Sequence, residues 1–279
     1  MKSGELKFER MEGFHKLASL WKVEFKVVTI EPLLTQAASE ETKEIVDGIL
    51  GKRIPKDFPD AVPLVIEGRA VVTGNSMKGL FRHIISSQLT EAGLEVCCQK
   101  VKCKDAPPSG RKEECPPENP CFVCNWFGTP SRQGALHFSL LKSVKEIGEV
   151  LVSDPIPMIA QREDYGAIDP KARAFLLLAP VKEGVEFRGW IKGENLSEEI
   201  IGAIKEVQDM SEKGFVQFGG FKTRGFGSVQ IEILKVEKYK TVPFGLEKAY
   251  EGSELKAFLE GCQKKYHDLL SSEAKGGKA

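Results

Sequence analysis

Residues 219–227 read Gly-Gly-Phe-Lys-Thr-Arg-Gly-Phe-Gly, so glycines are interleaved with two cations and two aromatic residues. Glycines permit close backbone approach and backbone angles that other residues resist. Successive N–H groups in such a loop can form a concavity that binds anions. Lys222 and Arg224 would supply charge for phosphates, and the phenylalanines could pack below the loop or stack on a base. Because short glycine-rich motifs also occur by chance, a wide turn with solvated cations is the alternative. The glycines are Gly219, Gly220, Gly225 and Gly227.

Composition limits the partner surfaces that the chain can have. Its 279 residues include 40 Lys plus Arg and 40 Asp plus Glu, so the formal net charge is zero. A strongly basic domain would indicate nucleic acid directly. Here a phosphate-binding surface has to be a local stripe that acidic surface elsewhere balances. The first ten residues are rich in charge, and no apolar run reaches the roughly 18 residues of a membrane helix, so we expect a cytoplasmic protein without a membrane segment.

Hydrophobic periodicity predicts a core of six elements. Alternating apolar and polar residues predict strands, and apolar residues that recur on one face predict helices. The resulting order is β-α-β-β-α-β, the ferredoxin-like arrangement. These elements are expected within residues 20–30, 71–94, 134–142 and 183–237. We therefore predict an α+β fold in which residues 1–279 form a single domain.

Further segments lie outside this core. Residues 97–130 carry six of the seven cysteines amid Pro, Lys and Glu, so they are predicted to be a Cys-rich insertion. Residues 145–180 mix strand-like and turn-like pieces in a second insertion. A short helix is predicted over residues 40–50. Residues 246–270 are predicted to form a peripheral C-terminal helix with Cys262 as a buried thiol.

Residues 74–83, Gly-Asn-Ser-Met-Lys-Gly-Leu-Phe-Arg-His, lie where a strand is predicted to pass into a helix. Ser76 would stand at the helix N-terminus, where free N–H groups and the helix dipole favour an anion. Lys78 and Arg82 are four residues apart and therefore share one helix face. The segment predicts a phosphate site, with an ordinary capped helix and exposed cations as the alternative.

Cysteine spacing predicts a structural zinc site. Cys121 and Cys124 have the separation with which two thiolates bind one zinc ion. The second pair is predicted to be Cys103 and Cys115, with Cys98 as a substitute. Because the surrounding loop is polar and proline-rich, metal binding would supply the folding free energy that burial does not. A redox-active Cys-x-x-Cys would usually begin a helix in a thioredoxin-like unit, and the sequence shows none.

Groups for acid–base or metal catalysis are few. The chain has four histidines, and no Ser-His-Asp or Cys-His pattern supports acyl transfer. A loop aspartate beside a phosphate-binding surface can hold magnesium or orient an attacking hydroxyl group. The loop aspartates are Asp47, Asp57, Asp60, Asp164 and Asp169.

Four segments together resemble the RAMP superfamily of CRISPR-associated proteins, most closely the repeated backbone subunit of type III interference complexes. Residues 74–82 are similar to the family's G-S-S-hydrophobic-K-G-x-hydrophobic-R helix start, and residues 219–227 to its G-G-G-x-x-R-G-F-G signature. Residues 121–128 resemble its C-P-V-C-x-L-F-G segment, and residues 166–170 its G-V-A-I-D stretch. The four segments also stand in the family's order.

The resemblance implies a modified ferredoxin-like (RRM-like) core that stacks with other RAMP subunits, including its own copies, into a filament along a CRISPR RNA. The helix start and the glycine-rich loop would grip the guide backbone. A thumb-like hairpin over about residues 156–174, which carries Arg162, Tyr165 and Arg173, would displace a nucleotide at regular intervals. Members that cleave complementary target RNA use an aspartate before the helix start together with a divalent metal such as magnesium. By position this residue is Asp60.

The chain departs from the family pattern in two places. Residues 29–35 replace a glycine-rich turn, and Thr73 replaces a proline before the helix start. The first departure lies next to the loop of Asp60, so Asp57 and Asp47 stay as alternatives for the cleaving residue.

Three functions follow from these observations. The favoured one is a subunit that binds guide RNA and cleaves target RNA. The second is an architectural subunit that binds RNA without cleaving it. The third is a stand-alone, metal-independent endoribonuclease that processes CRISPR repeats, for which His83 is the only candidate general base.

Overall fold

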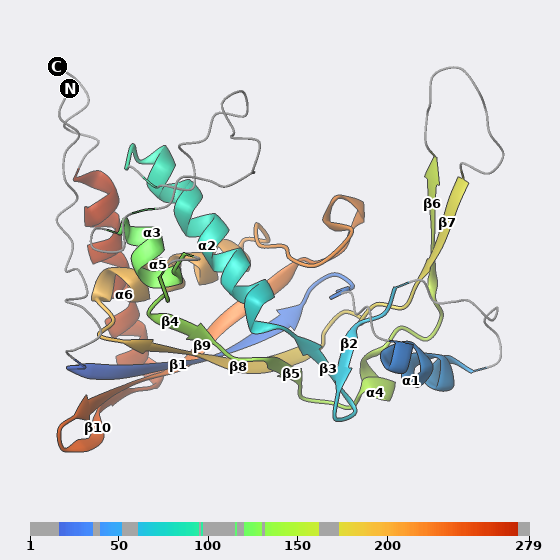
Figure 1. Cartoon of the computed structure of the whole chain (residues 1–279), viewed down its shortest axis with the longest axis horizontal. Coiled ribbons are helices and arrows are strands. Elements are labelled where there is room, and N and C mark those ends of the chain that lie inside the picture. Colours follow the sequence, from blue (N-terminus) through green and yellow to red (C-terminus); the bar gives the residue numbers. More distant parts are fainter. Residues whose placement is uncertain are drawn as a thin grey trace.

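The computed structural model describes residues 17–35, 40–51, 61–94, 96, 115, 120–129, 132–161 and 173–272. Within these ranges the predicted α+β fold and its β-α-β-β-α-β core are confirmed (Figure 1). The third core element of the prediction is two short strands rather than one. The core elements are β1 (Ser19–Thr29), α2 (Gly74–Glu91), β4 (Leu136–Phe138), β5 (Leu141–Ser143), β8 (Glu186–Glu194), α5 (Glu198–Glu212) and β9 (Val229–Thr241).

The core strands lie in the order β9-β1-β8-β5 within a longer antiparallel sheet. Three further strands extend it at both edges: β10 (Phe244–Tyr250) beside β9, and β3 (Arg69–Val72) followed by β2 (Leu64–Ile66) beside β5. β3 is the strand expected before the helix start, whereas β2 and β10 were not predicted. β4 also pairs with β8. The first core strand therefore lies at the centre, between β9 and β8, as the ferredoxin-like order requires.

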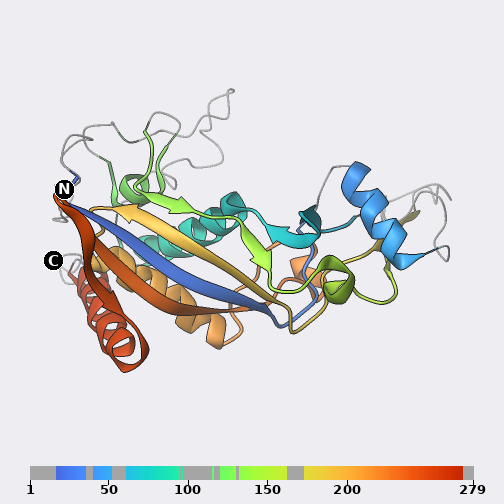
Figure 2. The same cartoon turned by 90° about the horizontal axis from the view of Figure 1, so that it is seen from below.

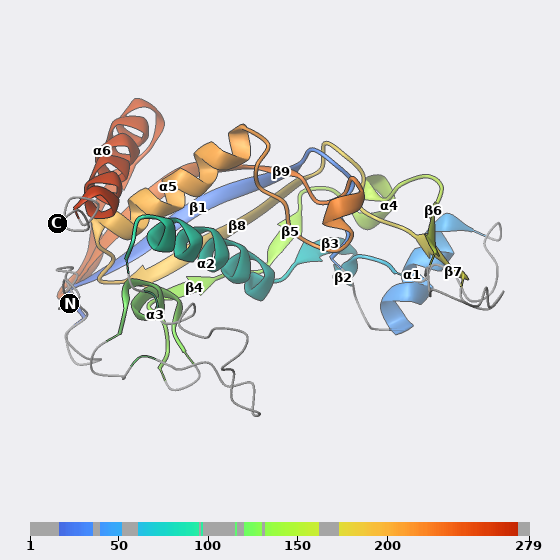
Figure 3. The same ribbon diagram turned by 90° about the horizontal axis from the view of Figure 1, so that it is seen from above.

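One face of the sheet is buried beneath helices. Trp21, Val23, Phe25 and Val27 alternate with less buried residues along β1 and form the floor of the hydrophobic core. Helices α2 and α5 lie across this face (Figure 3). They contribute buried apolar residues with helical spacing, among them Met77, Phe81, Ile85 and Leu89 of α2 and Ile200, Ile201, Ile204 and Val207 of α5.

The C-terminal segment differs from its prediction. Residues 246–250 belong to β10, and α6 spans Gly252–Ser271. Residues 244–250 form a strand rather than part of the helix because they pair with the end of β9, which extends to Thr241. Cys262 is buried on α6 as predicted, and burial raises the pKa of its thiol to about 12.

Helices α5 and α6 approach closely at Gly202. A Cβ atom built at Gly202 would lie 2.2 Å from the carbonyl oxygen of Cys262, which no side chain tolerates. Near the start of α5, Asn195 fastens the chain before β1. Its side-chain oxygen accepts hydrogen bonds from the amides of Ala18 and Ser19, while Ser197 is the N-cap residue.

The insertions add smaller elements. The predicted short helix is α1 (Glu40–Leu50). The Cys-rich insertion contains α3 (Phe122–Phe127), and α4 (Ile147–Val150) precedes a hairpin of β6 (Ile156–Gln161) and β7 (Arg173–Leu178). Figure 1 shows this hairpin standing away from the sheet. A short 3-10 helix, η3, covers Lys222–Arg224. None of the helices in the described ranges is long and apolar enough to cross a membrane.

The α5–α6 contact predicts opposite effects of two glycine substitutions. Gly202→Ala should lower the free energy of unfolding by about 1–3 kcal/mol, because the added methyl group forces the helices apart. Gly261→Ala is the matched control on α6, since its Cβ would meet nothing within 4 Å. It should raise the free energy of unfolding by about 0.5–1 kcal/mol. Equilibrium urea unfolding of both variants measures this, and equal stabilisation by both would contradict the close crossing.

Candidate functional site

The start of α2 is fixed by its own cap and by β4. The amide of Ser76 donates to the hydroxyl oxygen of Thr73 at 3.2 Å, and the two hydroxyl groups are 2.9 Å apart. Thr73, which stands where the family pattern has proline, is therefore the N-cap residue. A Cβ at Gly74 would lie 2.3 Å from the carbonyl oxygen of Phe138, so only glycine allows this approach to β4. The Ser76 amide is used within the protein, while its side chain remains exposed.

A basic hollow of about 370 Å³ lies between this helix and residues 127–129 and 132–134. Lys78, Arg82 and Arg132 line it, and its described lining contains no Asp or Glu. Burial, and then the charge of Arg82, lower the pKa of Lys78. An anion in the hollow would relieve this repulsion. His83 is exposed and is not among the lining residues.

Arg132 is a site residue that sequence reasoning missed. Its guanidinium group lies 3.5 Å from the side-chain oxygen of Asn125. The available signal was the pair of glycines around it. Gly128 has φ of +78°, and its Cβ would lie 2.5 Å from the nitrogen of Gly134, so the chain turns back on itself there. Arg82 spans the hollow by donating to the carbonyl oxygen of Gly128 at 3.2 Å.

The glycine-rich loop uses its glycines to dock on the chain beyond β1. Gly219 has φ of +90°, and a Cβ there would lie 2.7 Å from the carbonyl oxygen of Leu34. The Gly220 amide donates to that same oxygen at 2.9 Å, and the Gly227 amide donates to the carbonyl oxygen of Pro32 at 3.0 Å. These two amides are therefore not free to form the anion-binding concavity that the sequence suggested. Close backbone contact is the role that the structure gives these glycines.

The two phenylalanines of the loop pack inward. Phe226 is buried in a small cluster with Leu34, Ala61 and Leu178, and Phe221 packs against it. Since Leu178 ends β7, the cluster joins the loop to the base of the β6–β7 hairpin. Phe226 thus supports the loop from below and offers no ring for a base.

The cations of the loop remain at its surface. Lys222 and Arg224 are exposed, and the Arg224 guanidinium lies 5.9 Å from the centre of the Phe221 ring. Gly225 follows Arg224 and precedes the buried Phe226. Its φ is +80°, and a Cβ atom built there would meet nothing within 4 Å. The loop follows α5 and lies on the same side of the sheet as α2 (Figures 1 and 3). The two cationic segments thus belong to one side of the molecule.

Several predicted residues lie outside the described part of the chain: Asp57, Asp60, Cys98, Cys103, Arg162, Tyr165, Asp164 and Asp169. The first described residue after Asp60 is Ala61, which is buried in the cluster with Phe226. Its carbonyl oxygen accepts a hydrogen bond from the amide of Ala179 at 3.0 Å. The chain next to Asp60 is therefore anchored at the glycine-rich loop. Asp47 is exposed on α1.

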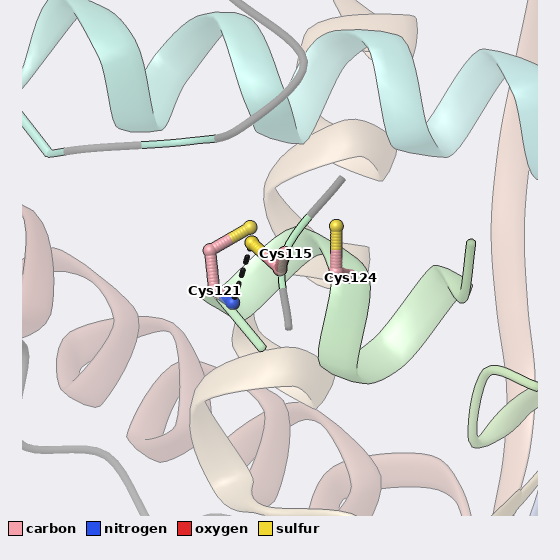
Figure 4. Close-up of side chains that lie close together, drawn as sticks. All are labelled: Cys115, Cys121 and Cys124. Carbon is pink, nitrogen blue, oxygen red and sulfur yellow. Dashed lines mark hydrogen bonds between the residues drawn. The ribbon is translucent and has the colours of Figure 1, made fainter. Parts of the chain in front are cut away.

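Three cysteines gather at the start of α3. The sulfur atoms of Cys115, Cys121 and Cys124 all lie within 4.8 Å of one another. Figure 4 shows the three side chains gathered there. The Cys121 amide donates to the sulfur of Cys115 at 3.3 Å, and Cys124 is buried. A tetrahedral ion with metal–sulfur bonds of about 2.3 Å places its sulfurs about 3.8 Å apart, so this cluster could hold one. Helix α3 leads directly into the wall of the basic hollow.

Comparisons with known proteins cover most of the chain. The sequence model of the RAMP superfamily matches residues 28–230. Among solved structures, one similar chain is described as "Cryo-EM structure of the Type III-B Cmr-beta bound to cognate target RNA"; it is 14% identical, with a TM-score of 0.49. The match covers 80% of this chain and 61% of that chain. No curated protein matches. Since the family match spans well over half of the residues, the chain belongs to the RAMP superfamily.

Proposed function

We propose that the chain is a backbone subunit of a type III CRISPR effector complex and that it binds guide RNA. The observation that carries this proposal is the pairing of the basic hollow at α2 with the exposed cations of the glycine-rich loop on one side of the sheet. Membership of the RAMP superfamily and the four family-like segments support it. The type III assignment rests on those segments.

Phosphate groups of the guide would contact Lys78, Arg82 and Arg132 in the hollow, and Lys222 and Arg224 on the loop. The exposed hydroxyl of Ser76 would add a hydrogen bond. Arg162, which follows β6 in the sequence, would contact the same RNA. Gly219, Gly220, Gly225 and Gly227 would act by shaping the loop.

Other subunits would continue the RNA-bound assembly. Partners in this proposal are the CRISPR RNA, complementary target RNA and other RAMP subunits, with copies of this chain forming a filament. The β6–β7 hairpin is suited to reach a neighbouring subunit, because it stands away from the sheet (Figure 1).

The cysteine cluster would bind structural zinc. Three thiol sulfurs at compatible separations favour zinc over magnesium or calcium, which prefer oxygen ligands. Cys103 is the proposed fourth ligand, with Cys98 as the substitute. Zinc would hold α3, and through α3 the wall of the basic hollow.

Cleavage of guide-bound target RNA would be the enzymatic activity of the subunit. A ribose 2′-hydroxyl would attack the adjacent phosphate as the bond from phosphorus to the 5′-oxygen of the next nucleotide breaks. The products would be a 2′,3′-cyclic phosphate and a free 5′-hydroxyl group, with Asp60 positioning magnesium or accepting the proton of the 2′-hydroxyl. Support comes from Ala61, which ties the chain beside Asp60 to the glycine-rich loop.

Charge removal tests RNA binding. Lys78→Ala or Arg224→Ala should weaken binding of guide RNA and flatten the salt dependence of its Kd, because each removes one phosphate contact. Filter binding over a range of salt concentrations measures both. Lys264→Ala, on the exposed surface of α6, is the matched control and should leave the affinity and slope near wild type. Equal effects of all three substitutions would contradict the assigned surface.

Metal analysis tests the cysteine site. Freshly purified, reduced protein should contain about one zinc per chain, and Cys121→Ser combined with Cys124→Ser should abolish it and destabilise the insertion. Cys262→Ser is the control, since Cys262 lies on α6 and outside the cluster, and it should keep the zinc. Wild-type protein without zinc would refute the site.

The third test concerns Asp60. The complex assembled with guide RNA should cut complementary labelled RNA at regular intervals only with magnesium, and Asp60→Ala should abolish cutting while target binding persists. Asp57→Ala and Asp47→Ala are the controls. Cuts that survive Asp60→Ala remove this residue from the mechanism, and tight binding without any cutting by wild type indicates the architectural role. Cleavage of repeat RNA by the isolated chain in chelator would contradict both filament functions.

A further inference from the structure

The face of the sheet opposite α2 and α5 is not uniform. Figure 2 shows strands β1, β8 and β9 in front of these helices. Toward the middle of this face the side chains form ion pairs, with Lys26 2.8 Å from Glu232 and Arg188 2.6 Å from Glu186. Such pairs are ordinary solvated surface.

Near the start of β1 the same face is apolar and hollowed. A hollow of about 750 Å³ is lined by the apolar residues Leu20, Trp21, Trp190, Tyr239 and Phe244 together with Gly193 and polar residues. The Phe244 side chain is 71% exposed, and Leu246 next to it on β10 is 56% exposed. Exposed apolar side chains gathered at one hollow mark a binding site.

The rings are held in defined positions. Strand register places Tyr239 opposite Leu20 on β1, and Glu24 opposite Trp190 on β8. Tyr239 donates its hydroxyl to Glu237 at 2.9 Å, and its ring is nearly parallel to that of Phe244 with centroids 5.7 Å apart. Trp190 therefore lies at one place in the hollow, and the stacked rings of Tyr239 and Phe244 lie at another.

Polar groups in the hollow could contact the phosphate group and the base edges of a nucleotide. The ammonium group of Lys192 lies 4.3 Å from the centre of the Trp190 ring. Lys22, which is ion-paired with Glu24, also lines the hollow together with His137 and Glu194. Lysines can contact phosphate, while imidazole and carboxylate groups can pair with the edges of bases. The size is that of a small-ligand pocket, which is smaller than a protein interface.

We infer that this hollow binds unpaired bases of single-stranded RNA by stacking on Trp190, Tyr239 and Phe244. The site lies on the opposite face of the sheet from Lys78 and the glycine-rich loop. It would therefore take a different stretch of RNA from the proposed guide contacts, and its existence does not depend on them. Stacking of bases on the aromatic residues of a four-stranded sheet is an established mode of RNA recognition.

The test uses the full chain with Lys78→Ala and Arg224→Ala, which weakens the proposed guide surface. A short labelled oligouridylate should bind and quench tryptophan fluorescence, because Trp190 is half-buried whereas Trp21 and Trp126 are buried. Phe244→Ala or Trp190→Leu in this background should raise its Kd at least about fivefold. Phe215→Ala removes a comparably exposed ring, 76% exposed and outside the hollow, and should leave the Kd unchanged.

Phe244 is the most informative position to substitute, because an exposed side chain contributes little to folding. An unchanged unfolding midpoint of Phe244→Ala would exclude a loss of folding. Absence of quenching, or equal effects of Phe244→Ala and Phe215→Ala, would overturn the inference. A concentration-dependent dimer that Phe244→Ala abolishes, without oligouridylate binding, would assign the hollow to a protein partner and overturn it as well. If Lys78→Ala and Arg224→Ala did not weaken binding of guide RNA, the proposed guide-binding surface would be refuted. The oligouridylate result at the aromatic hollow would be unaffected.

Discussion

The docking of the glycine-rich loop onto residues 32–34 is the contact on which the arrangement of the candidate site depends. It brings together the chain after β1, the start of β9 and, through Phe226, the base of the β6–β7 hairpin. Ala61 enters the same cluster, so the approach to α2 is fixed there too. A Cβ at Gly219 would separate these segments, because the carbonyl oxygen of Leu34 occupies its place.

Two sides of one sheet thus offer different chemistry. The helical side presents cations that line a hollow with no carboxylate among its described lining residues, which suits phosphate groups. The open side presents aromatic rings over an apolar floor, which suits bases. A zero net charge is compatible with both, since the cations are concentrated locally and ion pairs cover other surface.

Periodicity predicted the core well because long elements repeat their pattern many times. The helices at residues 40–50 and in α2 and α5 are clear examples. A strand of three residues such as β2 carries too few repeats to be recognised. Residues 246–250 were predicted to be helical, although pairing with β9 makes them a strand.

The candidate site was predicted less completely, for physical reasons. Lys78, Arg82, Lys222 and Arg224 stand in motifs, and the structure places them at or near the surface on one side of the sheet. Sequence could not show that the amides of Gly220 and Gly227 are used by Leu34 and Pro32, because those partners are remote in the chain. Arg132 belongs to no motif and becomes a lining residue only because the chain turns back between Gly128 and Gly134.

Helix α3, with only six residues, lies between two candidate sites. The sulfur cluster lies at its start, and the carbonyl oxygen that receives Arg82 lies just after its end. The Cys-rich insertion is consequently no detachable appendage. A relative without this insertion would need a different segment to form one wall of the basic hollow. The cysteine cluster and the hollow would therefore be expected to be kept or lost together.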